Sequence, residues 1–284
     1  MDNNRILMTQ EEQKEVMLYI LTEFANFCEE HNLNYFLDAG TLLGAVRHKG
    51  YIPWDDDVDV CMPIEDYDKF IQLTKKKEGV MSKSLVVEYP ENTIYPFLKI
   101  SDNRTILIEF PDKYPMEVSV YIDVFPKVGI FGEGFNSRIA CGLSSFLRYV
   151  QWFNKFSIYA WKENGNTIQK LIAAVGRFCI RKPNKPIQLQ NRFIHWYHKK
   201  YPLEVCKYVT TLTNGEFHKI APKECFANYI MMDFEGIKFR GPIGYDTYLK
   251  CLYPGDYMEL PPKDKRIHHD VMIYWKPDVQ KQIS

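Results

Sequence analysis

Three consecutive aspartates, Asp55, Asp56 and Asp57, lead directly into an apolar run, residues 58–62, that contains Asp59. Residues two apart in an extended strand share a face, so Asp57 and Asp59 point the same way, and Asp55 joins them if the strand begins early. Carboxylates gathered on one face repel one another unless a cation lies between them, and hard divalent ions prefer such oxygen ligands. The run therefore predicts a strand that begins at a site for a divalent metal, Mg²⁺ or Mn²⁺.

Three other interpretations of the acidic run remain open: an exposed acidic turn, a calcium-binding loop and a set of helix caps. The EF-hand pattern requires Gly at its sixth position and Glu at its twelfth. This chain has Val60 and Asp66 there if Asp55 takes the first position, so a calcium-sensor loop is disfavoured. An exposed turn would not be followed directly by residues that suit a buried strand, which favours the metal site.

A Gly-Thr pair, Gly40-Thr41, follows a short aromatic and apolar segment, residues 35–37, and precedes the acidic strand. Nucleotidyltransferases hold a polyphosphate in this layout, because glycine lets the backbone approach a phosphate and the amides of a following helix can donate to it. Such sites often take a third carboxylate from a neighbouring strand. Asp123 supplies one, because it is a lone acid inside the apolar run 121–125, where an unpaired charge would be costly.

The first 126 residues alternate between helical and strand-like spacing. Thr9 and Glu12 form a capping box, and the apolar residues behind it recur at helical spacing to about Glu30. Further helices are expected over residues 42–48 and 65–76, and strands at residues 35–37, 58–62, 85–88, 97–100, 105–109 and 118–125. These elements predict a small α/β or α+β sheet domain with helices on one side, and we expect the α+β class.

The remainder of the chain differs in its charge and in the spacing of its apolar residues. The segment from Arg138 to Lys207 is helical in spacing and contains thirteen Lys or Arg but only two acids, Glu163 and Glu204, an excess of eleven positive charges. A hairpin centred on Glu235-Gly236 and another helix are expected after it. We therefore expect three parts. They are a catalytic core (residues 1–126), a helical basic insertion (127–212), and a C-terminal hairpin and helix that complete the core (213–284).

Composition and charge exclude several classes of protein. With 36 Lys plus Arg and 36 Asp plus Glu the chain has no formal net charge, so no nucleic-acid partner is expected. No uncharged apolar run approaches the roughly 18 residues of a spanning helix, and residues 1–16 carry no signal-peptide pattern. The seven cysteines are scattered, without a C-x-x-C pair, which indicates reduced thiols. These features predict a cytoplasmic protein.

Several runs of residues recur in the order typical of one family. They are residues 37–48, 52–60, 97–100, 122–126, 234–237 and 253–262. Together they resemble the LicD family of phosphocholine transferases, which includes the fukutin-related proteins. The resemblance implies a nucleotidyltransferase-like fold that transfers phosphocholine, or a related phospho-head group, from CDP-choline to a hydroxyl of a cell-surface glycan, such as teichoic acid or lipopolysaccharide. CMP would be released.

The resemblance also implies roles for the residues singled out above. Asp57 and Asp59 look like the metal-binding pair, with Asp55 as an accessory ligand. Asp123 looks like the third carboxylate and is our candidate for the acceptor of the attacking hydroxyl's proton. Gly40 and Thr41 resemble the phosphate-side turn of the family.

Other candidate substrate contacts follow from position and residue type. Arg47 and Lys99 are candidates for neutralising the phosphate charge, with a salt bridge or a surface position as the alternative for each. Trp54 adjoins the acids, and its ring suits a quaternary ammonium group. His268 and His269 lie near the family's C-terminal block, with a solvated tail as the alternative.

Two further functions fit the same metal motif. One is a soluble nucleotidyltransferase that moves a nucleotide from a nucleoside triphosphate to a small molecule, and the other is a metal-dependent binding protein. Release of CMP from CDP-choline would identify the phosphocholine reaction, whereas release of pyrophosphate would identify nucleotide transfer.

The basic segment also predicts a surface for an anionic membrane, where a lipid-linked glycan acceptor would be presented. Its cations, among them Lys155, Lys162 and Lys170, are interleaved with aromatic residues that suit a membrane interface. These aromatic residues are Trp152, Phe153, Phe156, Tyr159 and Trp161. A packed helical lid with solvated lysines is the alternative.

Overall fold

The computed structural model describes residues 5–76, 81–109, 115–132, 134–160, 184–213, 220–262, 266 and 271–277, except for the side chains of residues 152–160. The chain forms two compact units. Unit 1 consists of residues 1–87, 99–124 and 226–284, and unit 2 of residues 88–98 and 125–225. Unit 2 therefore includes residues 127–212, which the sequence predicted as a helical basic insertion. Unit 1 combines N-terminal and C-terminal segments of the chain.

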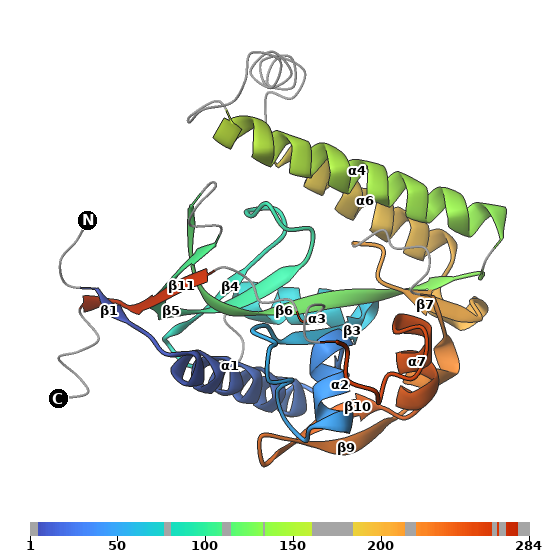
Figure 1. Cartoon of the computed structure of the whole chain (residues 1–284). Coiled ribbons are helices and arrows are strands. Elements are labelled where there is room, and N and C mark those ends of the chain that lie inside the picture. Colours follow the sequence, from blue (N-terminus) through green and yellow to red (C-terminus); the bar gives the residue numbers. More distant parts are fainter. Residues whose placement is uncertain are drawn as a thin grey trace. The chain divides into compact units, whose positions relative to one another are not determined.

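The sheet of unit 1 joins strands from distant parts of the chain (Figure 1). Its order is β1 (Ile6–Leu7), β11 (Val271–Trp275), β5 (Leu98–Glu109), β6 (Met116–Ile130), β3 (Asp59–Pro63) and β2 (Phe36–Leu37), with β4 (Leu85–Glu88) paired to β5. Strand β11 runs antiparallel to β1 and β5, and β2 runs antiparallel to β3. The α+β class predicted from the sequence is confirmed.

Helix α1 (Gln10–Glu30) has the capping box and the length that the sequence predicts. The Thr9 hydroxyl accepts a hydrogen bond from the Glu12 amide at 3.1 Å, and the Glu12 carboxylate accepts one from the Thr9 amide at 2.7 Å. On the apolar face of the helix, the Phe24 ring lies 5.3 Å from Tyr35 and 5.5 Å from Phe70. Because Phe70 belongs to helix α3 (Ile64–Lys76), these rings join both helices to the start of β2.

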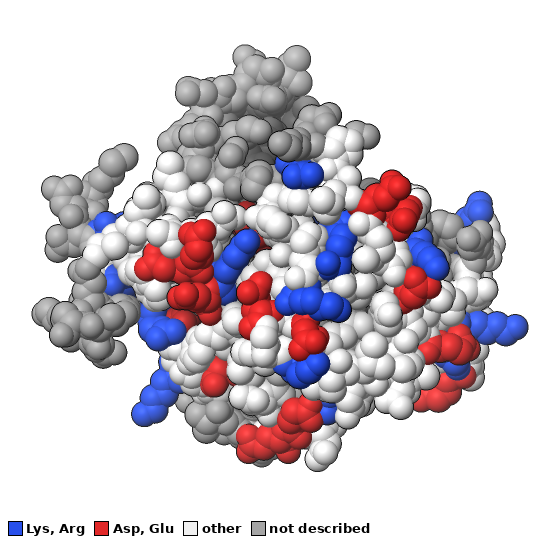
Figure 2. Space-filling view, turned by 60° about the horizontal axis from the view of Figure 1, so that its bottom comes forward, with Lys and Arg blue, Asp and Glu red and all other residues white. Residues whose placement is uncertain are grey.

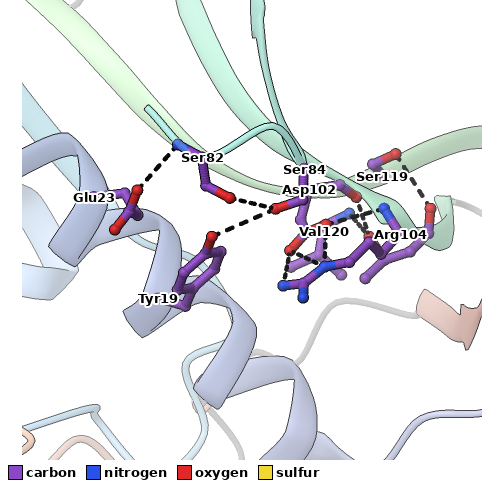
Figure 3. A network of polar contacts seen from close by, with 9 residues as sticks. Tyr19, Glu23, Ser82, Ser84, Asp102, Arg104, Ser119 and Val120 are labelled. Atoms are coloured by element: carbon purple, nitrogen blue, oxygen red, sulfur yellow. Dashed lines mark hydrogen bonds and ion pairs between the residues drawn. The ribbon is translucent and has the colours of Figure 1, made fainter. Parts of the chain in front are cut away.

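A polar network connects α1 to strand β5 (Figure 3). Arg104 donates to both carboxylate oxygens of the buried Asp102, with a shortest distance of 2.6 Å. The hydroxyl groups of Tyr19 and Ser84 lie 3.5 Å apart in the same network. The sequence predicted two separate strands between residues 97 and 109, and this was wrong. One strand continues through the polar stretch because Asp102 finds a charged partner inside it.

Helix α2 (Ala39–Arg47) begins at Ala39, earlier than the predicted start at residue 42. The reason is Asp38, whose carboxylate accepts a hydrogen bond from the Ala39 amide at 2.9 Å and caps the helix. The amides of the first turn of α2 therefore include Gly40 and Thr41, which the sequence placed in a turn.

The predicted hairpin and final helix are confirmed in unit 1. Strands β9 (Tyr229–Phe234) and β10 (Ile237–Pro242) pair antiparallel around Glu235 and Gly236, whose φ angles are 52° and 77°. Positive φ at both central residues is the geometry of a tight hairpin turn. Helix α7 (Tyr245–Leu252) follows the hairpin.

Unit 2 contains helices α4 (Phe135–Ala160) and α6 (Lys185–Lys200), which pack against each other. The end of β6 pairs with β7 (Tyr208–Thr210), which pairs with β8 (Ala221–Pro222). The described part of the chain also contains two 3-10 helices, Leu203–Val205 and Lys223–Phe226. The helical prediction for the basic segment is confirmed over α4 and α6, while residues 161–183 lie outside the described part. Among the described helices, none combines the length and the apolar character needed to cross a bilayer.

Candidate active site

The acidic run forms a loop that enters strand β3 and is fixed at several points along its backbone. The Gln13 side chain on α1 donates to the Asp56 carbonyl at 3.0 Å. The Asp59 amide donates to the Thr41 hydroxyl on α2 at 2.8 Å. The Asp123 amide on β6 donates to the Val58 carbonyl at 2.9 Å. Three elements from different parts of unit 1 therefore hold this loop in one conformation.

Gly40, in the first turn of α2, lies against the carboxylate of Asp55. A Cβ atom at position 40 would lie 2.5 Å from Oδ2 of Asp55, closer than van der Waals contact allows. Glycine is therefore required at this position for the carboxylate to sit beside the N-terminal turn of the helix, whose amides carry partial positive charge.

The acids open into a pocket of about 670 Å³ in unit 1. One wall is formed by α2 and the acidic loop, and the other by the segment that follows α7. Its lining residues are Ala39, Gly40, Leu43, Arg47, Ile52, Trp54, Asp55, Asp57, Asp59, Tyr253, Pro254, Gly255, Asp256, Tyr257, Glu259, Leu260, Pro261 and Pro262. The pocket thus brings together carboxylates, aromatic rings and one guanidinium group.

The carboxylates of the site act on one another electrostatically. Desolvation raises the pKa of Asp59 well above its ordinary value, and the negative charges of Asp57, Asp123, Asp38 and Asp55 raise it further, in that order. Desolvation also raises the pKa of the Tyr253 hydroxyl, and the negative charges of Asp59, Asp38, Asp55 and Asp57 raise it further. A cation bound among these side chains would relieve their mutual repulsion.

Asp123 and Lys99, two predicted site residues, are paired with each other. The Lys99 ammonium donates to Oδ1 of Asp123 at 2.7 Å and lies 3.2 Å from the centre of the Tyr121 ring. Desolvation raises the pKa of Asp123 to about 6, against the lowering effect of Lys99. Neither residue lines the pocket wall, although Asp123 is close enough to influence Asp59. Their roles toward metal and phosphate stay predictions.

Arg47 and Trp54 both line the pocket and both have partners within the protein. The Arg47 guanidinium donates to the carbonyls of Tyr257 at 2.7 Å and Glu259 at 3.1 Å, so it ties α2 to the opposite wall. The guanidinium of Arg266 lies 4.4 Å from the centre of the Trp54 ring. The face of Trp54 is thus already suited to a cation.

The remaining predicted residues fall in different places. Thr41 is buried, and its hydroxyl accepts the hydrogen bond from the Asp59 amide, so the structure shows it positioning an acid. His268 and His269 lie outside the described residues. Of the predicted site residues, the pocket collects Gly40, Arg47, Trp54, Asp55, Asp57 and Asp59.

Sequence reasoning missed the second wall of the pocket and a buried contact behind it. The segment 253–262 was recognised only as a turn and a family block, although its run of tyrosine, proline, glycine and aspartate is a signal for a shaped loop. The Tyr248 hydroxyl on α7 donates a short hydrogen bond to the Asp38 carboxylate, and both residues are buried. No local pattern in the sequence indicates this contact.

The carboxylates of the pocket are oxygen ligands of the kind that divalent cations prefer. Among the described residues, no three His, Cys, Asp or Glu side chains converge closely enough to ligate one ion. Mg²⁺ does not require this, because it commonly keeps several waters and is bound by one or two carboxylates together with phosphate oxygens of the substrate. Asp57 and Asp59 supply such a pair on the pocket wall.

Comparison with known proteins gives two independent kinds of match. Residues 32–127, which include α2 and the acids Asp38, Asp55, Asp57, Asp59 and Asp123, match the family described as LicD/FKTN/FKRP, nucleotidyltransferase domain. The chain is 32% identical over 273 residues to the lipopolysaccharide cholinephosphotransferase LicD of Haemophilus influenzae, which covers 92% of this chain and 96% of that protein. It is 33% identical over 89 residues to the ribitol 5-phosphate transferase FKRP of Mus musculus, which covers 31% of this chain and 18% of that protein.

Proposed function

Because the chain belongs to the LicD family and is a phosphotransferase, we propose that it transfers phosphocholine from CDP-choline to a hydroxyl group of a cell-surface glycan. The observation that carries the proposal is the pocket, in which Asp55, Asp57 and Asp59 lie beside the N-terminal turn of α2 at Gly40. Carboxylates for a cation and helix amides for a phosphate are the two features that a phosphodiester donor requires.

We propose that Asp57 and Asp59, with Asp55 as accessory, hold a divalent cation, Mg²⁺ or Mn²⁺. When bound, the cation supplies positive charge to the diphosphate of the donor. The residues of the chain contribute by holding the carboxylates in place. Gln13 and Thr41 fix the backbone of the acidic loop, so the carboxylates need no rearrangement when the donor arrives.

In the proposed reaction the acceptor hydroxyl attacks the phosphorus atom of phosphocholine. The new bond joins the acceptor oxygen to phosphorus, and the bond from phosphorus to the bridging oxygen breaks, so CMP leaves with the electron pair. The proton of the hydroxyl passes to the Asp123 carboxylate, which Lys99 holds at 2.7 Å. A pKa of about 6 suits a base that must be unprotonated before the reaction and protonated after it.

The lining of the pocket supports a cationic head group. Tyr253 and Tyr257 contribute aromatic rings to the lining, and Asp256 and Glu259 add negative charge on the wall opposite the acidic loop. Quaternary ammonium groups bind to such surfaces by cation-π and charge attraction. A neutral polyol would gain neither interaction. This supports phosphocholine over a polyol phosphate such as the one named for the mouse relative.

For the acceptor we propose a lipid-linked surface glycan, lipopolysaccharide or teichoic acid, reached at the inner face of the plasma membrane. The support is the Haemophilus influenzae relative, which is a lipopolysaccharide cholinephosphotransferase. An assay with each of the two glycans identifies the acceptor.

The test is the product of the reaction. Purified protein is incubated with CDP-choline, Mg²⁺ and a glycan extract, and CMP and pyrophosphate are both measured. We expect CMP, loss of turnover by about 10²-fold or more in Asp57→Asn, and full turnover in Asp233→Asn, an exposed acid of the β9–β10 hairpin. Pyrophosphate release from a nucleoside triphosphate would instead identify nucleotide transfer, and full activity of Asp57→Asn would rule out the assigned metal pair.

A further inference from the structure

Over residues 135–151, whose side chains the structure describes, helix α4 exposes large apolar side chains and buries polar ones. Five large apolar residues are exposed, with fractions of 77% for Phe135, 52% for Ile139, 40% for Leu143, 60% for Phe146 and 62% for Tyr149. At about 100° per residue, their spacing places all five on one third of the helix circumference. We call these five residues the outer stripe.

The opposite side of the same helix is buried and largely polar. Ser137, Ser144 and Gln151 are buried there beside Ala140 and Cys141. The Gln190 side chain on α6 donates to the Ser144 hydroxyl at 2.8 Å, and that hydroxyl lies 2.5 Å from the Leu212 carbonyl.

This pattern is the reverse of the one expected for a helix whose outer face contacts water. A helix that packs on a core and faces water buries its apolar residues and exposes its polar ones. Exposed apolar patches of this kind mark surfaces that meet another apolar phase or another molecule.

The charges around the outer stripe indicate what that partner is. Helices α4 and α6 contain seven Lys or Arg and no Asp or Glu. Arg138 is exposed one turn after Phe135, and Arg192, Lys199 and Trp196 are exposed on α6. By contrast, acids and bases are interspersed on the face of the molecule shown in Figure 2.

We propose that the outer stripe of α4 docks the protein on an anionic lipid bilayer, with its phenylalanine and tyrosine side chains among the head groups. An apolar helix face next to unbalanced cations is the pattern of helices that lie in a membrane interface. A second copy of the chain is a poorer partner, because the described helices α4 and α6 contain cations and no acids, so two copies that meet there would bring like charges together. The proposal does not depend on the proposed reaction.

The experiment is co-sedimentation of the whole protein with vesicles. Vesicles of phosphatidylglycerol and phosphatidylcholine in equal parts are compared with vesicles of phosphatidylcholine alone, at roughly 0.1 M and roughly 1 M salt. We expect binding to the anionic vesicles only, weakened at the higher salt. Failure to bind anionic vesicles at the lower salt overturns the proposal, whether or not the protein transfers phosphocholine.

Variants locate the surface. Phe135→Ser and Phe146→Ser should each lower vesicle binding about tenfold, because each removes one inserted ring. The double variant Arg192→Glu/Lys199→Glu should bind anionic vesicles more weakly, and its binding should depend less on the salt concentration. Met231→Ser changes an exposed apolar residue of the β9–β10 hairpin and should bind as the unchanged protein does.

Two results for the variants overturn the assignment. If Phe135→Ser and Phe146→Ser bind vesicles normally, the membrane surface lies elsewhere. If the unchanged protein is a dimer and the two variants are monomers, the outer stripe is an interface between copies. Circular dichroism confirms folding of each variant, and transfer to a soluble glycan fragment should be unchanged, because the outer stripe lies outside the pocket lining.

Discussion

At the scale of single residues, the site depends on small side chains as much as on charged ones. Gly40 contributes no chemistry, yet the carboxylate of Asp55 occupies the space that any Cβ atom at position 40 would need. Thr41 contributes a buried hydroxyl that accepts from the Asp59 amide. Two residues that the sequence assigned to phosphate binding therefore also fix the positions of two acids.

Gly40→Ala should lower turnover by about 10²-fold, because Asp55 must move away from the new methyl group and misplacement near 1 Å has this effect on catalysis. Steady-state kinetics with CDP-choline measure the loss. Gly142→Ala is the matched control, because a Cβ atom there meets nothing within 4 Å, and it should keep full turnover. Equal turnover in both variants would show that Asp55 has no part in the reaction.

Lys99→Met should destabilise the protein by about 3 kcal/mol, because it leaves the Asp123 carboxylate without the ammonium that pairs with it at 2.7 Å in a site where Lys99 is almost fully buried. Urea unfolding measures the difference. Lys238→Met removes a pair with Asp233 in which both side chains are about half exposed, and should cost about 0–1 kcal/mol. A cost for Lys99→Met no larger than that of Lys238→Met would contradict the buried ion pair.

The sequence reveals those site residues that lie in one short run. Asp55, Asp57 and Asp59 alternate along one short run and all three line the pocket, although only Asp59 belongs to strand β3 and the other two lie in the loop before it. The contact between Asp38 and Tyr248 is different, because it joins residues 210 positions apart. Such a contact depends on how α7 packs, which no local pattern encodes.

At the scale of elements, the β9–β10 hairpin supports the loop that leads to the acids. The Tyr51 amide donates to Oε1 of Glu235, in the hairpin turn, at 2.9 Å. The Glu235 amide in turn donates to the Lys49 carbonyl at 2.9 Å. Gly50 permits this approach, because a Cβ atom there would overlap the Glu235 carboxylate. The hairpin is predictable from its two turn residues, whereas its contact with residues 49–51 is not.

Glu235→Ala should cost about 1 kcal/mol of stability and lower turnover several-fold, because the Tyr51 amide loses its acceptor and the loop before the acids loosens. Thermal unfolding and steady-state kinetics measure the two effects. Lys238→Ala, on the same hairpin, should change neither. If Glu235→Ala loses stability but keeps turnover, the hairpin supports the fold without positioning the acids.

At the scale of the whole molecule, the pocket lies within unit 1, so a cation bound there stabilises that unit directly. A chain of two units need not unfold in one step, and its thermal transition can have two parts. Desolvation raises the pKa of Asp59, and the repulsion from neighbouring acids that raises it further is what a bound cation would reduce.

Mg²⁺ should therefore raise the unfolding temperature of unit 1, by roughly 3–6 °C at about ten times the dissociation constant. Differential scanning calorimetry measures the shift. The double variant Asp57→Asn/Asp59→Asn should show no shift in unfolding temperature with Mg²⁺, whereas Asp233→Asn should show the full shift. An equal shift in all three proteins would place the cation outside the acidic pocket.

The two walls of the pocket come from opposite ends of the chain, one from residues 39–59 and the other from residues 253–262. Because synthesis proceeds from the N-terminus, Asp55, Asp57 and Asp59 leave the ribosome long before residues 253–262, which enclose them. Until that segment emerges, the nascent chain has carboxylates but no enclosed site, so it has no means of retaining a donor. Catalytic competence thus arises late in synthesis, and a protease that cuts after α7 would abolish it while leaving Asp55, Asp57 and Asp59 in place.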